Sequence, residues 1–213
     1  GGMESMTNAP YLLKKHRSGA RLGHDTTYDH MFLDGLEDAY EEGRAMGTFA
    51  QDTANDYQMT REEMDDYSIE SLRRANAAIE SGAFDGEVVP VTFSARKGDV
   101  TVEHDEQPGK GRPDKIPQLR PAFAKDGTIT AATSSSISDG AAAVVLTRES
   151  VAKENGQEPV AKIVAMAAHA QEPSEFTVAP IGAIEKVLDK AGWSADEVDL
   201  WEVNEAFACV AMF

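Results

Sequence analysis

The sequence of 213 residues contains only one cysteine, Cys209. A single cysteine excludes a disulfide bond within the chain and a zinc site built from several thiolates. Disulfide bonds are rare in reducing compartments, so this scarcity favours a cytoplasmic protein. Cys209 lies in an apolar, helix-like run, where a small buried side chain is a simpler interpretation than a reactive thiol.

Long hydrophobic runs are also missing. Hydrophobic residues make up 41% of the chain and the mean hydropathy is −0.39. No segment approaches the roughly 18 consecutive apolar residues of a membrane-spanning helix. The first six residues have neither the basic nor the apolar stretch that is typical of a signal peptide. These features favour a soluble globular protein.

Basic residues are scarce: 20 lysines and arginines face 37 aspartates and glutamates, and the net charge is −17. Nucleic acids and anionic membranes attract a basic surface, so neither is expected as a partner. Surface charges are screened over roughly 8 Å, so local cations can still hold a phosphorylated small ligand. Lys110, Arg112 and Lys115, in the polar segment 104–117, are candidates, although a solvated loop explains them equally simply.

Several signatures of catalysis or cofactor binding are absent. The sequence has no glycine-rich phosphate loop of the dinucleotide or P-loop kind. No pair of histidines has the spacing of metal ligands, so we expect no metal site. No residue pattern indicates a permanently bound cofactor.

The order of patterns favours an α/β fold. Residues 61–81 combine a capping box, formed by Thr60 and Glu63, with apolar residues at helical spacing, and Gly82 is placed to end this helix. Residues 87–93 and 99–103 predict a hairpin around 96–98. From residue 158 the pattern alternates: a strand at 160–168, a helix ending at Gly192, and a strand at 200–203 whose following helix Asn204 can cap.

The remaining segments give weaker patterns. Residues 7–60 are rich in loop signals, and residues 104–117 are typical of an irregular surface segment. The alanine run after Asp139 and Gly140 predicts a short helix that leads into a buried strand at 144–146. Residues 204–213 form an apolar run, and domains usually end in polar segments, so we expect the protein to continue beyond them.

Two clusters are candidates for ligand binding. Residues 204–208 follow the predicted strand at 200–203, and ligands of α/β proteins usually bind at the carboxyl ends of strands. A helix cap is the simpler interpretation of Asn204. The serines at 134–136 offer hydroxyl and backbone N–H groups to an anion or amide, although serine-rich turns are common.

Seven short segments, in order along the whole chain, resemble motifs of the thiolase family. They are residues 1–11 (GG-x-E-S-M-S-x-x-P), 34–50 (DGL followed by MG-x-T-A-E), 60–65 (S-R-E-E-Q-D), 119–123 (LRPAF), 126–131 (DGTVTA), 138–143 (NDGAAA) and 204–208 (NEAFA). No single match is decisive, but seven in this order at plausible spacing are highly specific.

The resemblance implies the α/β thiolase fold, which consists of two βαβαβαββ halves with a loop domain inserted in the first half. This chain would contain only part of that fold. Residues 1–6 would end a segment of the first half, and residues 7–133 would form the loop domain that covers CoA. Residues 134–156 would close the first half, and residues 157–213 would begin the second half.

The family transfers acyl groups through a cysteine acyl-enzyme, either condensing two acetyl-CoA to acetoacetyl-CoA or cleaving 3-ketoacyl-CoA by thiolysis. The resemblance therefore implies CoA and acyl-CoA as substrates, a role in fatty acid metabolism, and a homodimer or homotetramer. Cys209 matches neither the C-x-S-G nor the C-x-G-G context of the family's two cysteines, and G-H-P is absent. We expect this chain to be inactive alone.

The family's functional residues fall on specific positions here. Asn204 would hold a water for the oxyanion site, and Ala206 and Phe207 would line the acyl pocket. Ser135 and Ala131 would lie near the pantetheine of CoA.

Met46 would pack against the substrate. Lys110, Arg112 and Lys115 would approach the CoA phosphate, although a small length difference displaces them. Two departures weaken the assignment of a short-chain substrate: Ala45 replaces a frequent histidine, and residues 130–136 are more polar than T-A-G-N-A-S-G. A non-catalytic CoA-binding or assembly protein is the alternative.

Overall fold

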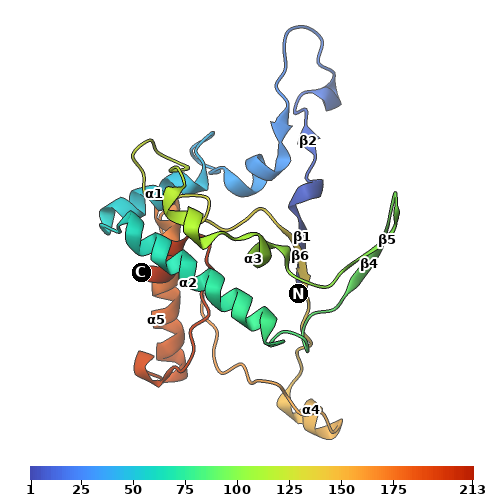
Figure 1. Ribbon diagram of the computed structural model, residues 1–213, viewed down its shortest axis with the longest axis vertical. Coiled ribbons are helices and arrows are strands. Elements are labelled where there is room, and N and C mark those ends of the chain that lie inside the picture. Colours follow the sequence, from blue (N-terminus) through green and yellow to red (C-terminus); the bar gives the residue numbers. More distant parts are fainter. The chain divides into compact units, whose positions relative to one another are not determined.

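The computed structural model describes all 213 residues, and the chain divides into two compact units. Unit 1 comprises residues 1–53, 137–204 and 213, and unit 2 comprises residues 54–136 and 205–212. Figure 1 labels the elements along the chain. None of the helices combines the length and the apolar character that crossing a membrane requires.

The strands form three separate antiparallel pairs. The pairs are β1 (Gly2–Ser5) with β6 (Asp139–Ala142), β2 (Tyr11–Leu12) with β3 (Tyr28–Asp29), and β4 (Val91–Ala95) with β5 (Gly98–Val102).

The α-helices are α1 (Met46–Asp56), α2 (Arg61–Glu80), α3 (Glu106–Lys110), α4 (Glu149–Glu154), α5 (Ala179–Ala191) and α6 (Ala208–Met212). Short 3-10 helices span Met6–Asn8, His16–Ser18, Pro113–Gln118, Pro173–Val178 and Ala195–Glu197, and a π-helical turn spans Phe32–Leu36.

The predicted helix over residues 61–81 is confirmed as α2, the longest element. The Thr60 hydroxyl accepts a hydrogen bond from the Glu63 N–H, and the Glu63 carboxylate accepts one from the Thr60 N–H. This capping box satisfies two donors that the first helical turn leaves without partners. Gly82 follows the helix at φ +71°, a conformation that glycine adopts without steric cost. Both ends of α2 are therefore fixed locally.

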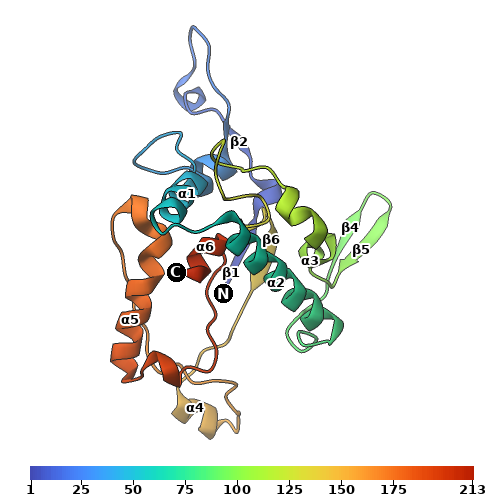
Figure 2. The same ribbon diagram turned by 60° about the vertical axis from the view of Figure 1, so that its left-hand side comes forward.

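The predicted hairpin is confirmed, although its first strand begins at Val91 rather than at residue 87. On one face of the hairpin, Val91 lies opposite Val102 and Phe93 lies opposite Val100. On the other face, side-chain hydrogen bonds join Thr92 to Thr101 and Ser94 to Asp99. Both views show the hairpin extending away from the rest of unit 2 (Figures 1 and 2).

Helix α1 lies where the sequence predicts loops, and that prediction is wrong. Its sequence is rich in threonine, asparagine and aspartate, which favour caps and turns over helix interiors. Burial compensates, because Phe49 and Ala50 are fully enclosed and Phe176 meets the Phe49 ring edge-on at 6.3 Å. The Thr53 hydroxyl bonds that of Thr177 at 2.7 Å. Tertiary contacts in unit 1 therefore stabilise this helix where local preference does not.

The strands predicted at residues 160–168 and 200–203 are absent. Their residue types suit a strand, but a strand also needs a neighbouring backbone with which to exchange hydrogen bonds. No segment of this chain pairs with either stretch, and Val160 and Leu200 are among the most exposed apolar side chains. The carbonyls of Met166 and Ala168 instead accept hydrogen bonds from Lys190 and Lys186.

Three further local predictions are wrong. The segment 104–117 is not irregular, because it contains α3 and begins the 3-10 helix Pro113–Gln118. The run after Asp139 is the strand β6 rather than a helix, since β1 lies beside it and supplies a ladder. Residues 144–146 are exposed and are not a strand. In contrast, the helix that ends at Gly192 is confirmed as α5, with Gly192 left-handed at φ +70°.

A buried ion pair joins α2 to the 3-10 helix Pro113–Gln118 within unit 2. The Arg61 guanidinium contacts the Asp65 carboxylate at 2.7 Å, and it donates to the carbonyls of Ile116 and Leu119 at 2.9 and 3.0 Å. Asp65 is 4% exposed, so no solvent can replace the arginine. One side chain therefore pairs with one oxygen of a buried carboxylate and satisfies two backbone acceptors.

Replacing Arg61 with methionine would leave this carboxylate buried without its cation. We expect Arg61→Met to lower the free energy of unfolding by about 3 kcal/mol, measured by urea denaturation followed by circular dichroism. Arg73→Met is the control, because the ion pair of Arg73 with Glu70 is exposed and should contribute little. Equal effects of the two substitutions would contradict this interpretation.

Candidate functional site

Two segments that are far apart in the sequence pair side by side in unit 2. The Ser135 N–H donates to the Ala206 carbonyl, and the Ala208 N–H donates to the Thr133 carbonyl, both at 2.9 Å. Ser134 and Phe207 form an antiparallel β-bridge between these bonds. The structure therefore brings together two motifs, the serine cluster and residues 206–208, that the sequence indicates separately.

Hydroxyl groups fix the turn that precedes this pairing. The Thr133 hydroxyl accepts from the Thr130 N–H at 2.8 Å, and the Thr130 hydroxyl accepts from the Ala132 N–H at 3.2 Å. The Ser134 hydroxyl donates to the Thr130 carbonyl at 2.8 Å. Thr130 and Thr133 are buried, so these bonds satisfy groups that water cannot reach. Ala131 lies exposed in the middle of the turn.

Phe207 anchors the other side of the pairing. Its side chain is buried, and the Phe123 ring meets it edge-on at 6.1 Å, an arrangement that aromatic rings prefer. Ala208 and Cys209 follow on α6 and are also buried, whereas Ala206 is half-buried. Of the predicted acyl-pocket residues, Phe207 is thus held by the core of unit 2 and Ala206 by its backbone bond to Ser135.

A pocket of about 240 Å³ adjoins this pairing within unit 2. Its walls come from α2, from Gln107 and Pro108 of α3, from residues 132–135, and from Glu205 and Ala208. Sites for drug-sized ligands usually measure about 300–1,000 Å³, so this pocket is too small to hold a whole CoA. Of the predicted substrate-binding residues, it contains Ser135.

Glu205 lies in the predicted cluster at residues 204–208, but the sequence gives it no role of its own. Its carboxylate accepts hydrogen bonds from the Tyr67 and Ser71 hydroxyls, each at 2.7 Å. Tyr67 and Ser71 are four residues apart on α2, so both hydroxyls lie on one helical face. That spacing is visible in the sequence, but nothing local identifies Glu205 as the partner.

Asn204 belongs to unit 1, and its side chain is exposed. The cap predicted for it is wrong, because α6 begins only at Ala208 and residues 204–207 intervene. Its place at the oxyanion site stays a prediction.

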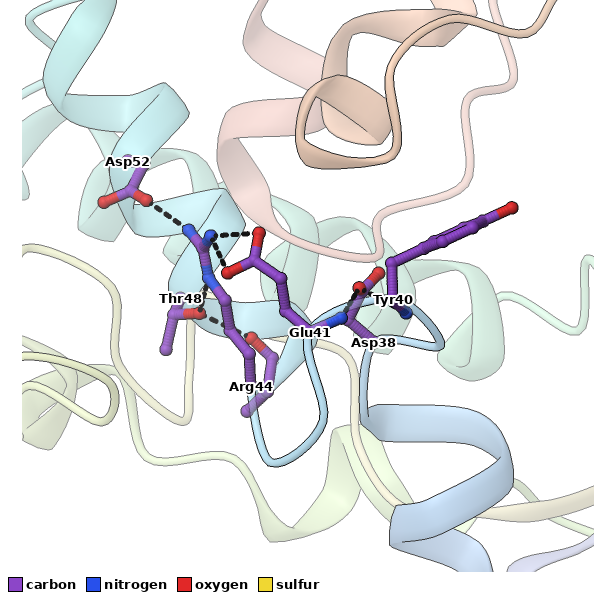
Figure 3. A network of polar contacts seen from close by, with 7 residues as sticks. Asp38, Tyr40, Glu41, Arg44, Thr48 and Asp52 are labelled. Carbon is purple, nitrogen blue, oxygen red and sulfur yellow. Dashed lines mark hydrogen bonds and ion pairs between the residues drawn. The ribbon is translucent and has the colours of Figure 1, made fainter.

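Met46 is the first residue of α1 and is half-buried. The loop before it is held by Arg44, whose guanidinium contacts Glu41 at 2.8 Å and Asp52 at 2.6 Å and donates to the Thr48 hydroxyl (Figure 3). The same guanidinium lies 3.7 Å from the centre of the Phe49 ring, in a cation–π contact. Arg44 therefore fixes the start of the helix that carries Met46.

The three predicted phosphate-binding cations are exposed in unit 2: Lys110 ends α3, Lys115 lies in the 3-10 helix Pro113–Gln118, and Arg112 lies between the two. Lys110 pairs with Glu106 at 2.8 Å, and its hydrogen bond lowers the pKa of that carboxyl. Lys115 lies 3.7 Å from Asp114, and Arg112 donates to the Gly111 carbonyl. The assignment of these cations to a phosphate stays a prediction.

The comparisons with known proteins establish the family. A model of the thiolase N-terminal domain matches residues 1–150, and one of the thiolase C-terminal domain matches residues 157–213. The chain belongs to the thiolase family.

Individual relatives agree with this assignment. The chain is 46% identical over 213 residues to a probable acetyl-CoA acetyltransferase of Dictyostelium discoideum, covering all of the chain and 51% of that protein. It is 42% identical over 214 residues to an acetyl-CoA acetyltransferase of Gibberella zeae named as cytosolic, covering all of the chain and 54% of that protein. The chain thus spans about half the length of these curated relatives.

A solved structure confirms the predicted fold class. The acetyl-CoA acetyltransferase of Bacillus anthracis superposes with a TM-score of 0.94 at 40% identity, covering all of this chain and 54% of the other. The fold is therefore an incomplete thiolase-like α/β fold.

The burial of Cys209 predicts its reactivity. Burial raises the pKa of the thiol to about 11, so at pH 8 only about one thiol in a thousand is ionised. We expect iodoacetamide to label the native chain at pH 8 at least tenfold more slowly than the chain unfolded in guanidinium, as measured by mass spectrometry. Equally fast labelling of the two forms would contradict a structural role for Cys209.

Proposed function

We propose that this chain is part of a thiolase-type acyltransferase. The whole protein would condense two acetyl-CoA to acetoacetyl-CoA or cleave 3-ketoacyl-CoA by thiolysis. The observation that carries the proposal is the backbone pairing of residues 133–135 with residues 206–208. In the thiolase pattern these segments serve the pantetheine and the acyl group, which are adjacent parts of one substrate. Family membership and the names of the relatives add support.

In this proposal the chain contributes substrate binding and stabilisation of negative charge. Ser135 and Ala131 lie beside the pantetheine, Ala206 and Phe207 line the acyl pocket, and Met46 packs against the substrate. The N–H groups and hydroxyls of residues 130–135 are largely committed to the turn itself, so they present a fixed surface to the ligand. A preorganised surface loses little freedom on binding.

The covalent step requires a thiolate that this chain does not offer. Its one thiol is buried and protonated, and it lies in neither of the family's cysteine contexts. We therefore assign the acyl-accepting cysteine, the second cysteine and the G-H-P histidine to the half of the relatives' length that this chain does not span. Asn204 would hold a water that donates to the carbonyl oxygen as it gains negative charge.

The division of the chain is also taken from the family resemblance. Residues 7–133 form the loop domain that covers CoA, flanked by residues 1–6 and 134–156 of the first half, and residues 157–213 begin the second half. Lys110, Arg112 and Lys115 of the loop domain would approach the CoA phosphate. CoA and acyl-CoA are substrates, so the chemistry proposed here uses no permanently bound cofactor.

The cellular location, the metabolic role and the assembly of the protein are further parts of the proposal. A cytoplasmic location suits the single reduced cysteine, and the Gibberella zeae relative is named as cytosolic. A role in fatty acid metabolism and a homodimeric or homotetrameric assembly follow from the family resemblance.

Replacing Asn204 with alanine in the full-length protein tests the proposed chemistry. We expect acetoacetyl-CoA thiolysis to slow by about 10²–10³-fold, because one donor to the developing oxyanion is lost. The cleavage is measured as the loss of absorbance of the magnesium enolate of acetoacetyl-CoA.

The conservative control is Asn204→Asp, which keeps the size of the side chain but removes its N–H donors and should be equally slow. An unaltered rate in Asn204→Ala would remove Asn204 from the mechanism. A wild-type protein that binds CoA without acyl transfer would instead favour a non-catalytic CoA-binding or assembly protein.

A further inference from the structure

Glu205 is held by two hydroxyl groups of a rigid helix. The Tyr67 and Ser71 hydroxyls donate to its two carboxylate oxygens at 2.7 Å each, and both come from α2. Hydrogen bonds to an ionised acceptor are roughly twice as strong as those between neutral groups. Because α2 has a capping box at its start and Gly82 at its end, it provides a fixed anchor.

The residue that follows Glu205 is fixed by a different segment. The Ala206 carbonyl accepts the Ser135 N–H at 2.9 Å, so successive residues are tied to α2 and to the serine turn. Phe207, the next residue, is buried against Phe123. Three consecutive residues of this motif therefore have their positions determined by three different parts of unit 2.

We propose that Glu205 is a positioning residue: Tyr67 and Ser71 hold its carboxylate, and through it they set the placement of Ala206 and Phe207 for catalysis. The inference rests on the proposed acyl transfer, in which these two residues line the acyl pocket. Displacing a reacting group by about 1 Å can lower a rate by about 10²-fold, so a contact outside the chemistry can still control it.

The exposure of Glu205 argues that this contact serves placement more than stability. An exposed carboxylate is solvated without a protein partner, and so folding gains little from satisfying it. Two simultaneous hydroxyl donors nevertheless select one orientation of the side chain. The cost of losing them should therefore appear mainly in the catalytic step.

The test measures acetoacetyl-CoA thiolysis by the full-length protein and its variants. We expect Tyr67→Phe and Ser71→Ala each to lower kcat by about two- to tenfold, with the KM for CoA changed less than twofold. Glu205→Ala should lower kcat at least as much as either change, and Glu205→Gln, which keeps one carbonyl acceptor, should recover part of that loss. In the Glu205→Ala background, Tyr67→Phe should have no further effect, because residues in contact are coupled.

Two matched controls remove the same groups elsewhere. Ser81→Ala deletes the hydroxyl of the residue that caps the end of α2, which donates to the Ala78 carbonyl. Tyr40→Phe deletes an exposed phenol hydroxyl. Both should leave kcat unchanged. Thermal unfolding of every variant shows whether a lower kcat reflects loss of folded protein, and Tyr67→Phe and Glu205→Gln are mild enough to stay folded.

The possible outcomes separate the two proposals. If the wild type is active but the Tyr67→Phe and Glu205→Ala losses multiply independently, the positioning role is wrong and the proposed function stands. Losses of kcat that merely follow the loss of folded protein would overturn the inference in the same way. A folded wild type without acyl transfer would overturn the proposed function and this inference with it.

Discussion

The backbone pairing between residues 133–135 and residues 206–208 is the constraint on which the candidate site depends. It joins two segments that the chain separates widely, and hydrogen bonds of 2.9 Å fix its register. A shift of one residue would turn Phe207 out of its contact with Phe123, because neighbouring residues of an extended segment point in opposite directions. The buried ring therefore selects the register, and the register determines which backbone atoms face Ser135.

The turn at residues 130–134 is stabilised partly by side chains that differ from those of the thiolase pattern. The thiolase pattern T-A-G-N-A-S-G has glycine where this chain has Ala132 and Ser136, and it has asparagine where this chain has Thr133. The Thr130 and Thr133 hydroxyls accept backbone N–H bonds and thereby satisfy a tight turn from within. Thr130 is shared with the pattern, so of these two residues the departure that takes part in specifying the turn is Thr133. The turn buries the hydroxyls of Thr130 and Thr133, and both are hydrogen-bonded.

The sequence predicted those elements whose signals are local. Helix α2, its capping box, the hairpin turn at Gly98 and the glycine that ends α5 depend on near neighbours, and all were predicted correctly. Helix α1 was missed because burial of Phe49 stabilises it against poor local preference. The strands at 160–168 and 200–203 were predicted from residue type, but a strand exists only where another backbone lies beside it. The site divides in the same way: the serine cluster was recognisable, whereas the role of Glu205 depends on a partner on α2.

The strong negative charge of the chain constrains how an anionic substrate could be recognised. The net charge is −17, and Lys110 and Lys115 already lie beside acidic neighbours on their own helical segments. Long-range attraction therefore cannot draw a phosphorylated ligand to this surface, because exposed charges are screened within roughly 8 Å. In the proposed function, recognition depends on contacts at short range, and the turn at 130–135 with its paired segment holds polar groups of unit 2 in fixed hydrogen bonds. Donors that are already hydrogen-bonded offer little to the phosphates of the proposed substrate, and Ser135 is assigned to its uncharged pantetheine arm.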